Sequence, residues 1–374
     1  MSNIVISGSG LFIPPHTVSN DELIQAYNAY VEKFNAENAA AIEAGDVEAL
    51  PTSSSEFVEK ASGIKSRYVM YKEGMLDPER MAPTFKPALA GDEPETVTMA
   101  IAAGREAMEQ ANKKPEDIDL VIMGTTNHQR PYPSAAVEVQ QKLGIKGFAY
   151  DMGIACSTMT FAMINAFTAL KAGTAKCVLV VNPEFASPQV NLKSRDSHFI
   201  FGDVATAVVM ELEDTCTADY AFRVLDTKQM TTFSDNIRCD GNYTDHSFSD
   251  DQLPEDRPYF RQNGRKVFKE LLPLVTGFIS EQLVENKLEA SDLKRMWLHQ
   301  ANLTMNMFAA KKLLGSEPEA NETPIVLDEF ANTASAGSLI AFHRHKDGFE
   351  SGEKGLICSF GAGYSVGSLL VEKI

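Results

Sequence analysis

Short, continuously apolar runs alternate with helical patterns along most of this chain. The runs at 118–125 and 177–181 lack the alternation of a half-exposed strand, so they are typical of strands buried on both faces of a parallel sheet. Amphipathic patterns at 95–112, 134–143 and 266–286 predict helices between such strands. Strands that alternate with helices in this way predict an α/β protein.

The same rhythm starts again in the second half of the chain. Strands are predicted at 296–299, 325–327, 355–358 and 368–372, and helices at 302–314 and 334–345. We interpret 1–213 and 214–374 as two versions of one unit, although no sequence repeat accompanies the division. An acidic segment at about 21–55, rich in Ala, Asn and Glu, predicts a helical excursion on the surface of the first half.

The charge balance narrows the choice of partners. The chain has 34 basic and 51 acidic residues and a net charge of −17, which argues against nucleic acid or an anionic membrane as its main partner. No apolar run approaches the length of a membrane span, and the N-terminus has no secretory pattern. We therefore expect a cytoplasmic protein.

The five cysteines are scattered and contain no C-x-x-C pair. This spacing is neither a disulfide framework nor a zinc site, and it fits a reducing compartment. His343 and His345 form an H-x-H, but no nearby cysteine or third histidine completes a set of ligands. The sequence predicts no bound metal.

One cysteine, Cys156, lies where the sequence predicts a reactive thiolate. An apolar run ends at Cys156, and the following residues have the pattern of a helix that ends near Gly173. Ser157 and Thr158 can supply capping oxygens to its first turn. Unpaired N–H groups and the helix dipole would favour a thiolate at Cys156. The alternative is a buried, inert cysteine.

Three other stretches place polar or glycine residues at the ends of predicted strands, where open α/β sheets bind ligands. They contain His299, Asn332 and the glycine-rich segment 359–367. Those glycines allow the backbone to pass close to a ligand and to direct N–H groups at an oxyanion. Each stretch alone is ambiguous, but a Cys, a His and an Asn at three strand ends can together carry out acyl chemistry.

These residues carry a resemblance that covers nearly the whole chain. The sequence is similar to the β-ketoacyl-acyl-carrier-protein synthase III family through 125–136 (with Pro-Tyr-Pro-Ser-Ala-Ala), the Cys156 stretch, 195–205, 263–269, 299–302, Lys311-Lys312, Asn332-Thr333 and 361–367. The resemblance implies a thiolase fold, in which two five-stranded βαβαβαββ halves form a five-layered αβαβα sandwich. It also implies a homodimer.

The implied chemistry uses three catalytic residues and no cofactor. Cys156 takes an acyl group from an acyl-coenzyme A or acyl-carrier thioester, and malonyl-acyl carrier protein then enters and loses CO₂. His299 and Asn332 stabilise the resulting enolate, which attacks the acyl-cysteine. The N–H groups of Cys156 and Ala362 form the oxyanion hole.

The resemblance assigns seven further positions. Tyr132 and Phe360 are placed at the acyl pocket, Tyr132 by reaching into the partner subunit. Phe57, Arg195, Lys269, Lys311 and Lys312 are placed at the binding site for coenzyme A or the acidic carrier protein. The sequence departs from the family where Phe57 and Ala61 replace the usual adenine-stacking pair and where Thr304 replaces a frequent arginine.

We therefore expect an acyltransferase of fatty acid biosynthesis that makes a 3-oxoacyl-acyl-carrier-protein by decarboxylating Claisen condensation. The departures leave a second hypothesis open, namely a specialised-metabolite condensing enzyme or acyltransferase of the same fold with a non-acetyl, medium-chain primer. A third hypothesis, a thiolase-fold subunit that only binds, is disfavoured because Cys156, His299 and Asn332 are all present.

Overall fold

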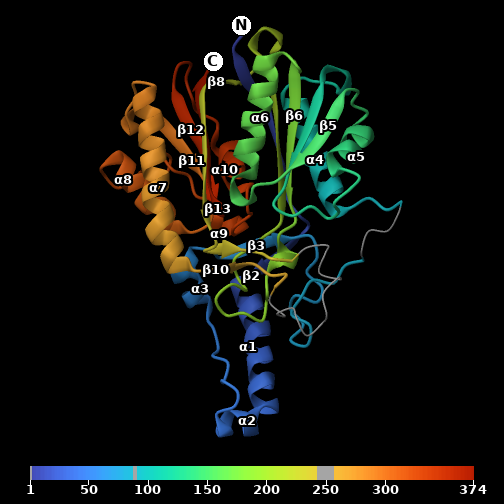
Figure 1. Cartoon of the computed structure of the whole chain (residues 1–374), viewed down its shortest axis with the longest axis vertical. Helices are drawn as coiled ribbons and strands as arrows, with labels where there is room; N and C mark the ends of the chain where they lie inside the picture. Colours follow the sequence, from blue (N-terminus) through green and yellow to red (C-terminus); the bar gives the residue numbers. More distant parts are fainter. Residues whose placement is uncertain (1, 87–90, 242–256) are drawn as a thin grey trace.

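A mixed sheet of nine hydrogen-bonded strands runs through the computed structural model, which describes residues 2–86, 91–241 and 257–374 (Figure 1). From one edge to the other the strands are β11 (Leu293–Leu298), β12 (Lys354–Gly361), β13 (Gly363–Lys373), β8 (Phe222–Ser234), β1 (Ile4–Phe12), β7 (Val204–Leu212), β6 (Cys177–Glu184), β4 (Leu120–Gly124) and β5 (Phe148–Met152). Neighbours at both edges are parallel, whereas the central strands are antiparallel.

The two halves of the chain contribute unequally to this sheet. Five strands come from the first half and four from the second, and they join where β1 pairs with the first residues of β8. The predicted strand at 325–327 is wrong. The backbone N–H of Val326 donates to the side chain of Gln300 (3.1 Å) instead of to a strand, and helix α9 (Leu327–Phe330) begins at the next residue. The division near residue 213 stays a prediction.

Helices lie in three layers around the strands (Figure 1). Helices α4 (Glu95–Gln110) and α5 (Ala135–Leu143) pack on strands of the first half, and α7 (Gly264–Glu285) and α8 (Leu303–Leu314) lie beside the strands of the second. Helices α6 (Thr158–Ala172) and α10 (Gly337–His345) lie between them, and each contacts strands of both halves. The expected α/β/α/β/α layering is therefore present.

The apolar run in β4 shows why these strands lack alternation. Val121 and Met123 pack in the apolar cluster under α4 and α5, whereas Leu120 and Ile122 belong to the central cluster around α6. Both faces of the strand are buried, so every position must be apolar.

A helical excursion projects from one end of the molecule (Figure 1). It consists of α1 (Asn20–Glu37) and α2 (Ala39–Ala44), and it is followed by α3 (Ser55–Ser62). A capping box in which Ser19 and Glu22 bind each other's backbone N–H groups starts α1. Two small ribbons, β2 (His16–Ser19) with β3 (Ser66–Val69) and β9 (Ile237–Arg238) with β10 (Arg261–Gln262), lie at the same end.

Among the helices that the structure describes, none has the length and apolar character needed to span a bilayer.

Candidate active site

Cys156 lies in a single 3₁₀ turn (155–157) between β5 and α6. Ala155 before it has a φ of 52°, a left-handed conformation that non-glycine residues rarely adopt and that turns the chain sharply from strand to helix. Gly361 at the end of β12 lies against the cysteine, since a Cβ at Gly361 would be 2.4 Å from the Cβ of Cys156 and 2.8 Å from its Sγ. The nucleophile is therefore enclosed between a strained turn and a glycine.

The predicted capping by Ser157 and Thr158 is wrong. The Ser157 hydroxyl donates to the carbonyls of Ser359 (3.3 Å) and Ser365 (3.0 Å), so it ties the cysteine turn to β12 and β13. The Thr158 hydroxyl accepts from the N–H of Ile154 and donates to a carbonyl of the turn itself. Both hydroxyls therefore hold the turn, and the Ser157 side chain makes no capping hydrogen bond to α6.

The expected thiolate at Cys156 is also not what the surroundings favour. The pKa of the Cys156 thiol is raised to about 11, mainly because the thiol is buried, and the negative charge of Glu184 contributes to this increase. The backbone N–H groups of Ala362 and of Cys156 itself lower the pKa, because they stabilise negative charge on the sulfur. Desolvation outweighs them, so the free thiol is the resting form. The same two N–H groups are those predicted to form an oxyanion hole.

His299 follows β11, where its N–H donates to the carbonyl of Cys358 on the neighbouring strand (2.9 Å). Its ring meets that of Phe360 edge to face at a centroid distance of 5.4 Å. Burial lowers the pKa of His299 to about 4, so the imidazole is neutral at pH 7 and has one N–H to donate. Its Nδ1 is buried without a hydrogen-bond partner among the described residues.

Asn332 lies on the loop between α9 and α10. Its backbone forms an isolated parallel bridge with Phe201, in which its N–H donates to Ile200 and its carbonyl accepts from Gly202. The side-chain oxygen accepts from the N–H of Ala334 (3.0 Å), which leaves the amide N–H groups for a ligand.

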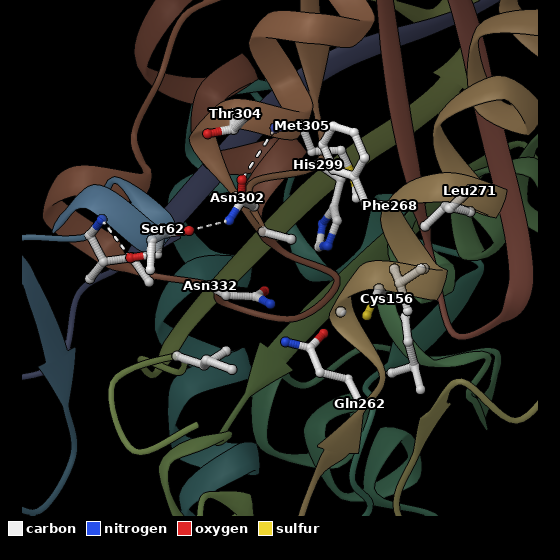
Figure 2. Close-up of a pocket in the computed structure, with 18 of the residues that line it drawn as sticks. Ser62, Cys156, Gln262, Phe268, Leu271, His299, Asn302, Thr304, Met305 and Asn332 are labelled. Carbon is white, nitrogen blue, oxygen red and sulfur yellow. Dashed lines mark hydrogen bonds between the residues drawn. The ribbon is translucent and has the colours of Figure 1, made fainter. Parts of the chain in front are cut away.

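These three residues meet at one cavity of about 490 Å³. Figure 2 shows the thiol of Cys156, the imidazole of His299 and the carboxamide of Asn332 turned toward the same space. Much of the remaining wall is apolar and includes Phe199, Ile200, Ile237, Phe260, Val267, Phe268, Leu271 and Phe360. A nucleophile and two hydrogen-bond donors at an apolar cavity can bind and transfer an acyl chain.

The other predicted pocket residues divide into two groups. Phe360 and Phe57 line the cavity. Arg195 lies behind Phe57, with its guanidinium 4.0 Å from the ring centroid and its Nε donating to the carbonyl of Thr52. Tyr132 is outside this cavity and 81% exposed, so the structure does not bring it to Cys156 within one chain.

The three predicted carrier-binding lysines also lie outside the cavity. Lys269 is exposed on α7, and Lys311 and Lys312 are exposed on the facing helix α8. Lys311 forms an ion pair with Glu317. Their role in binding a carrier protein stays a prediction.

Sequence reasoning missed Gln262, which lines the cavity from the short strand β10. Its carboxamide points toward the space between Cys156 and Asn332 (Figure 2). The expected stretch 263–269 begins one residue later, and a two-residue strand leaves no pattern in the sequence. Asn302, by contrast, is occupied structurally, because it caps α8 at Met305 and donates to the carbonyl of Ala61.

Two family models match this chain. Residues 150–232 match 3-oxoacyl-[acyl-carrier-protein] synthase III, and residues 283–373 match the C-terminal part of the same family. These segments contain Cys156, His299, Asn332 and the glycine-rich segment.

Curated relatives extend the match along the chain. The β-ketodecanoyl-[acyl-carrier-protein] synthase of Pseudomonas aeruginosa is 47% identical over 351 residues, which cover 94% of this chain and 100% of that protein. The β-ketoacyl-[acyl-carrier-protein] synthase III of Brucella anthropi is 31% identical over 332 residues, covering 87% of this chain and 93% of that one.

Solved structures have the same fold at lower identity. The 3-oxoacyl-[acyl-carrier-protein] synthase III of Aquifex aeolicus superposes with a TM-score of 0.75 over 99% of both chains at 24% identity. The priming β-ketosynthase of the R1128 polyketide pathway superposes with a TM-score of 0.78 over 99% of this chain and 96% of that chain, at 23% identity. The thiolase-type fold is thereby confirmed, and the chain belongs to the 3-oxoacyl-[acyl-carrier-protein] synthase III family of acyl-transferring condensing enzymes.

Proposed function

We propose that this condensing enzyme joins an eight-carbon acyl primer to malonyl-acyl carrier protein and releases a ten-carbon 3-oxoacyl-acyl carrier protein and CO₂. The observation that carries the proposal is the convergence of Cys156, His299 and Asn332 on one apolar cavity. The proposed reaction uses thioester substrates and needs no cofactor or metal.

In the first half-reaction the sulfur of Cys156 attacks the thioester carbonyl of the donor. A bond forms between the cysteine sulfur and the acyl carbon, the bond to the donor's sulfur breaks, and the thiol proton leaves with the donor's thiol. The N–H groups of Cys156 and Ala362 are proposed to hold the developing oxyanion. Their effect on the pKa of the thiol supports this role, because both already stabilise negative charge at the sulfur.

In the second half-reaction malonyl-acyl carrier protein loses CO₂, and the electron pair of the broken carbon–carbon bond forms an enolate. Neutral His299 and the free amide of Asn332 are proposed to donate to the enolate oxygen. The enolate carbon attacks the carbonyl of the acyl-cysteine, the bond from that carbonyl carbon to the cysteine sulfur breaks, and the released sulfur takes a proton from solvent to restore the thiol. Donors that bind the enolate more strongly than the thioester lower the barrier to decarboxylation.

The primer length follows from carbon counting. The Pseudomonas aeruginosa relative is named for a β-ketodecanoyl product, and a malonyl unit contributes two carbons after decarboxylation. An eight-carbon primer therefore gives such a product. The apolar wall contributed by residues such as Phe268, Leu271 and Phe360 supports a chain of this kind over an acetyl group.

The carrier of the primer and the assembly of the enzyme belong to the proposal as well. Acyl-coenzyme A is the proposed donor, with Phe57 and Arg195 beside the cavity as its contacts. Lys269, Lys311 and Lys312 would meet the acidic carrier protein. A homodimer is supported by β5, an edge strand with the exposed Phe148 at its start.

Intact-protein mass spectrometry after incubation with acyl-coenzyme A donors of two to twelve carbons tests the first half-reaction. We expect a gain of one acyl group, largest with the eight-carbon donor. The adduct should be absent in Cys156→Ala and retained in Cys239→Ala, which removes a cysteine outside the cavity.

Malonyl-acyl carrier protein added to the acylated enzyme tests the second half-reaction. The proposal expects CO₂ and a ten-carbon product. An adduct without CO₂ release would instead identify an acyltransferase, and an adduct only with a two-carbon donor would contradict the assigned primer.

A further inference from the structure

A buried carboxylate lies behind the proposed catalytic residues. Strand β6 ends at Glu184, whose side chain has 0% exposure. Six donors bind its two oxygens, namely the hydroxyls of Thr125 (3.3 Å) and Thr126 (2.6 Å), the N–H of Thr126 (3.1 Å), the amide of Asn182 (3.2 Å), and the N–H (3.2 Å) and hydroxyl of Ser335. Within the described part of the chain, no Lys, Arg or His forms an ion pair with it.

The donors require a carboxylate rather than its amide. Backbone N–H groups can only donate, and one lies on each oxygen, from Thr126 on Oε2 and from Ser335 on Oε1. A glutamine would place an NH₂ group on one of these two positions, where a donor would face a donor. A carboxylate satisfies both positions together. Burial raises the pKa of Glu184, while the hydrogen bonds from Ser335, Thr126 and Asn182 oppose that increase because they stabilise the ionised form.

The hydrogen bonds between Ser335 and Glu184 hold the loop that carries Asn332. Ala331 and Ala334, on either side of Asn332, have φ values of 59° and 50°, so the loop bends through two left-handed residues. Such conformations persist only where the surroundings hold them. Ala334 also donates the hydrogen bond that orients the Asn332 amide (3.0 Å), and Glu184 holds the next residue along the chain.

We infer that Glu184 is a positioning residue, which holds the loop at Ser335 so that the amide of Asn332 faces the enolate. The inference rests on the proposed function only through the role of Asn332. It assigns a task to a carboxylate that does not line the cavity.

The effect of the Glu184 charge on Cys156 can be measured as the reactivity of the thiol. Glu184 acts on Cys156 through its negative charge, which raises the pKa of the thiol beyond the increase that burial causes. The donors that bind the carboxylate are hydroxyls, an amide and N–H groups, none of which titrates near neutral pH. Neutralising Glu184 should therefore make the thiol more acidic and more reactive at a given pH.

Three variants separate positioning from charge. Glu184→Gln removes the charge and one hydrogen-bond acceptor, whereas Ser335→Ala removes a hydroxyl contact and keeps the charge. Glu211→Gln is the matched control, because Glu211 also has 0% exposure but pairs with Lys113 at the opposite end of β6 and β7. Three rates are measured for each variant, namely acylation of Cys156 by octanoyl-coenzyme A, decarboxylation of malonyl-acyl carrier protein, and alkylation of Cys156 by iodoacetamide across pH.

For Glu184→Gln we expect decarboxylation to slow about tenfold or more through kcat. Acylation should not slow, and the alkylation profile should shift to lower pH. Ser335→Ala should slow decarboxylation without moving the alkylation profile, and Glu211→Gln should change none of the three rates. Should Glu184→Gln fail to fold, Ser335→Ala still decides the positioning role.

A Glu184→Gln enzyme that decarboxylates like the wild type, or slows equally with Glu211→Gln, would overturn the inference. A wild-type enzyme that neither takes up an acyl group nor releases CO₂ would contradict the proposed function instead. In that case an unchanged alkylation profile in Glu184→Gln would overturn the action of Glu184 on Cys156, and a shifted profile would support it.

Discussion

Cys156 shows how opposing electrostatic effects combine at one residue. Its place before α6 and the N–H groups of Ala362 and Cys156 favour a thiolate, while burial and Glu184 favour the thiol. The sequence predicts the first group of effects, because a strand followed by a helix is visible in its pattern. Burial depends on which distant segments cover the turn, and for that reason the direction of the pKa shift could not be predicted.

Alkylation of Cys156 should therefore keep accelerating well into alkaline pH. The thiolate is the reactive form, so below the pKa of about 11 the rate rises about tenfold with each pH unit. Mass spectrometry of the Cys156 peptide after timed exposure to iodoacetamide measures this rate. A plateau between pH 7 and 9 would show that the thiol ionises more easily than its burial implies.

Two turns that lie against each other form the active site. The turn before α6 and the turn after β12 approach so closely that Gly361 has no room for a side chain. The sequence predicted that the glycines of 361–367 allow a close approach, and Gly361 makes one against Cys156. Which glycine faces the nucleophile could not be predicted, because that depends on the register of β12 against β13.

Gly361→Ala tests this contact. The added Cβ would lie 2.4 Å from the Cβ of Cys156, so the turn or the nucleophile must move. We expect acyl-enzyme formation to slow about a hundredfold, since displacements near 1 Å at a reacting atom have effects of that order. Gly277→Ala in α7 is the control, because a Cβ there meets nothing within 4 Å. Equal acylation rates in the two variants would contradict the argument.

Strand β8 is an element of the fold that the sequence pattern did not predict. It is 13 residues long, yet much of it is exposed or half-buried, and its polar run includes Thr227, Lys228 and Gln229. Backbone pairing with β13 holds it in place, and backbone pairing leaves no apolar signature. Sequence patterns predicted the helices and strands that bury apolar side chains. They did not predict strands such as β8 that are held mainly by main-chain hydrogen bonds.

The two edge strands of the nine-stranded sheet, β11 and β5, differ in how their outer sides are covered. Along β11 the N–H of Met296 donates to the carbonyl of Glu322, so a loop covers part of that edge. Along β5 Phe148 is 45% exposed, and Asp151 binds the first N–H groups of α5, near the exposed Val137 and Tyr132. Exposed apolar side chains beside an edge strand are typical of an interface between copies.

Phe148→Asp should therefore weaken the proposed homodimer. Sedimentation velocity should give about twice the chain mass of 40.9 kDa for the wild type and a larger monomer fraction for the variant. Phe308→Asp on α8 replaces another exposed aromatic residue away from this edge and should remain dimeric. Dissociation by Phe308→Asp alone, or a monomeric wild type, would contradict the assignment of the interface.

The protonated state of Cys156 also affects how readily peroxide can oxidise it. Peroxide attacks thiolates and converts them to sulfenic acid and then to irreversible sulfinic and sulfonic acids. A thiol whose pKa is held near 11 presents almost no thiolate to peroxide at neutral pH. Cys156 should therefore be oxidised by peroxide more slowly at neutral pH than a cysteine whose resting form is the thiolate.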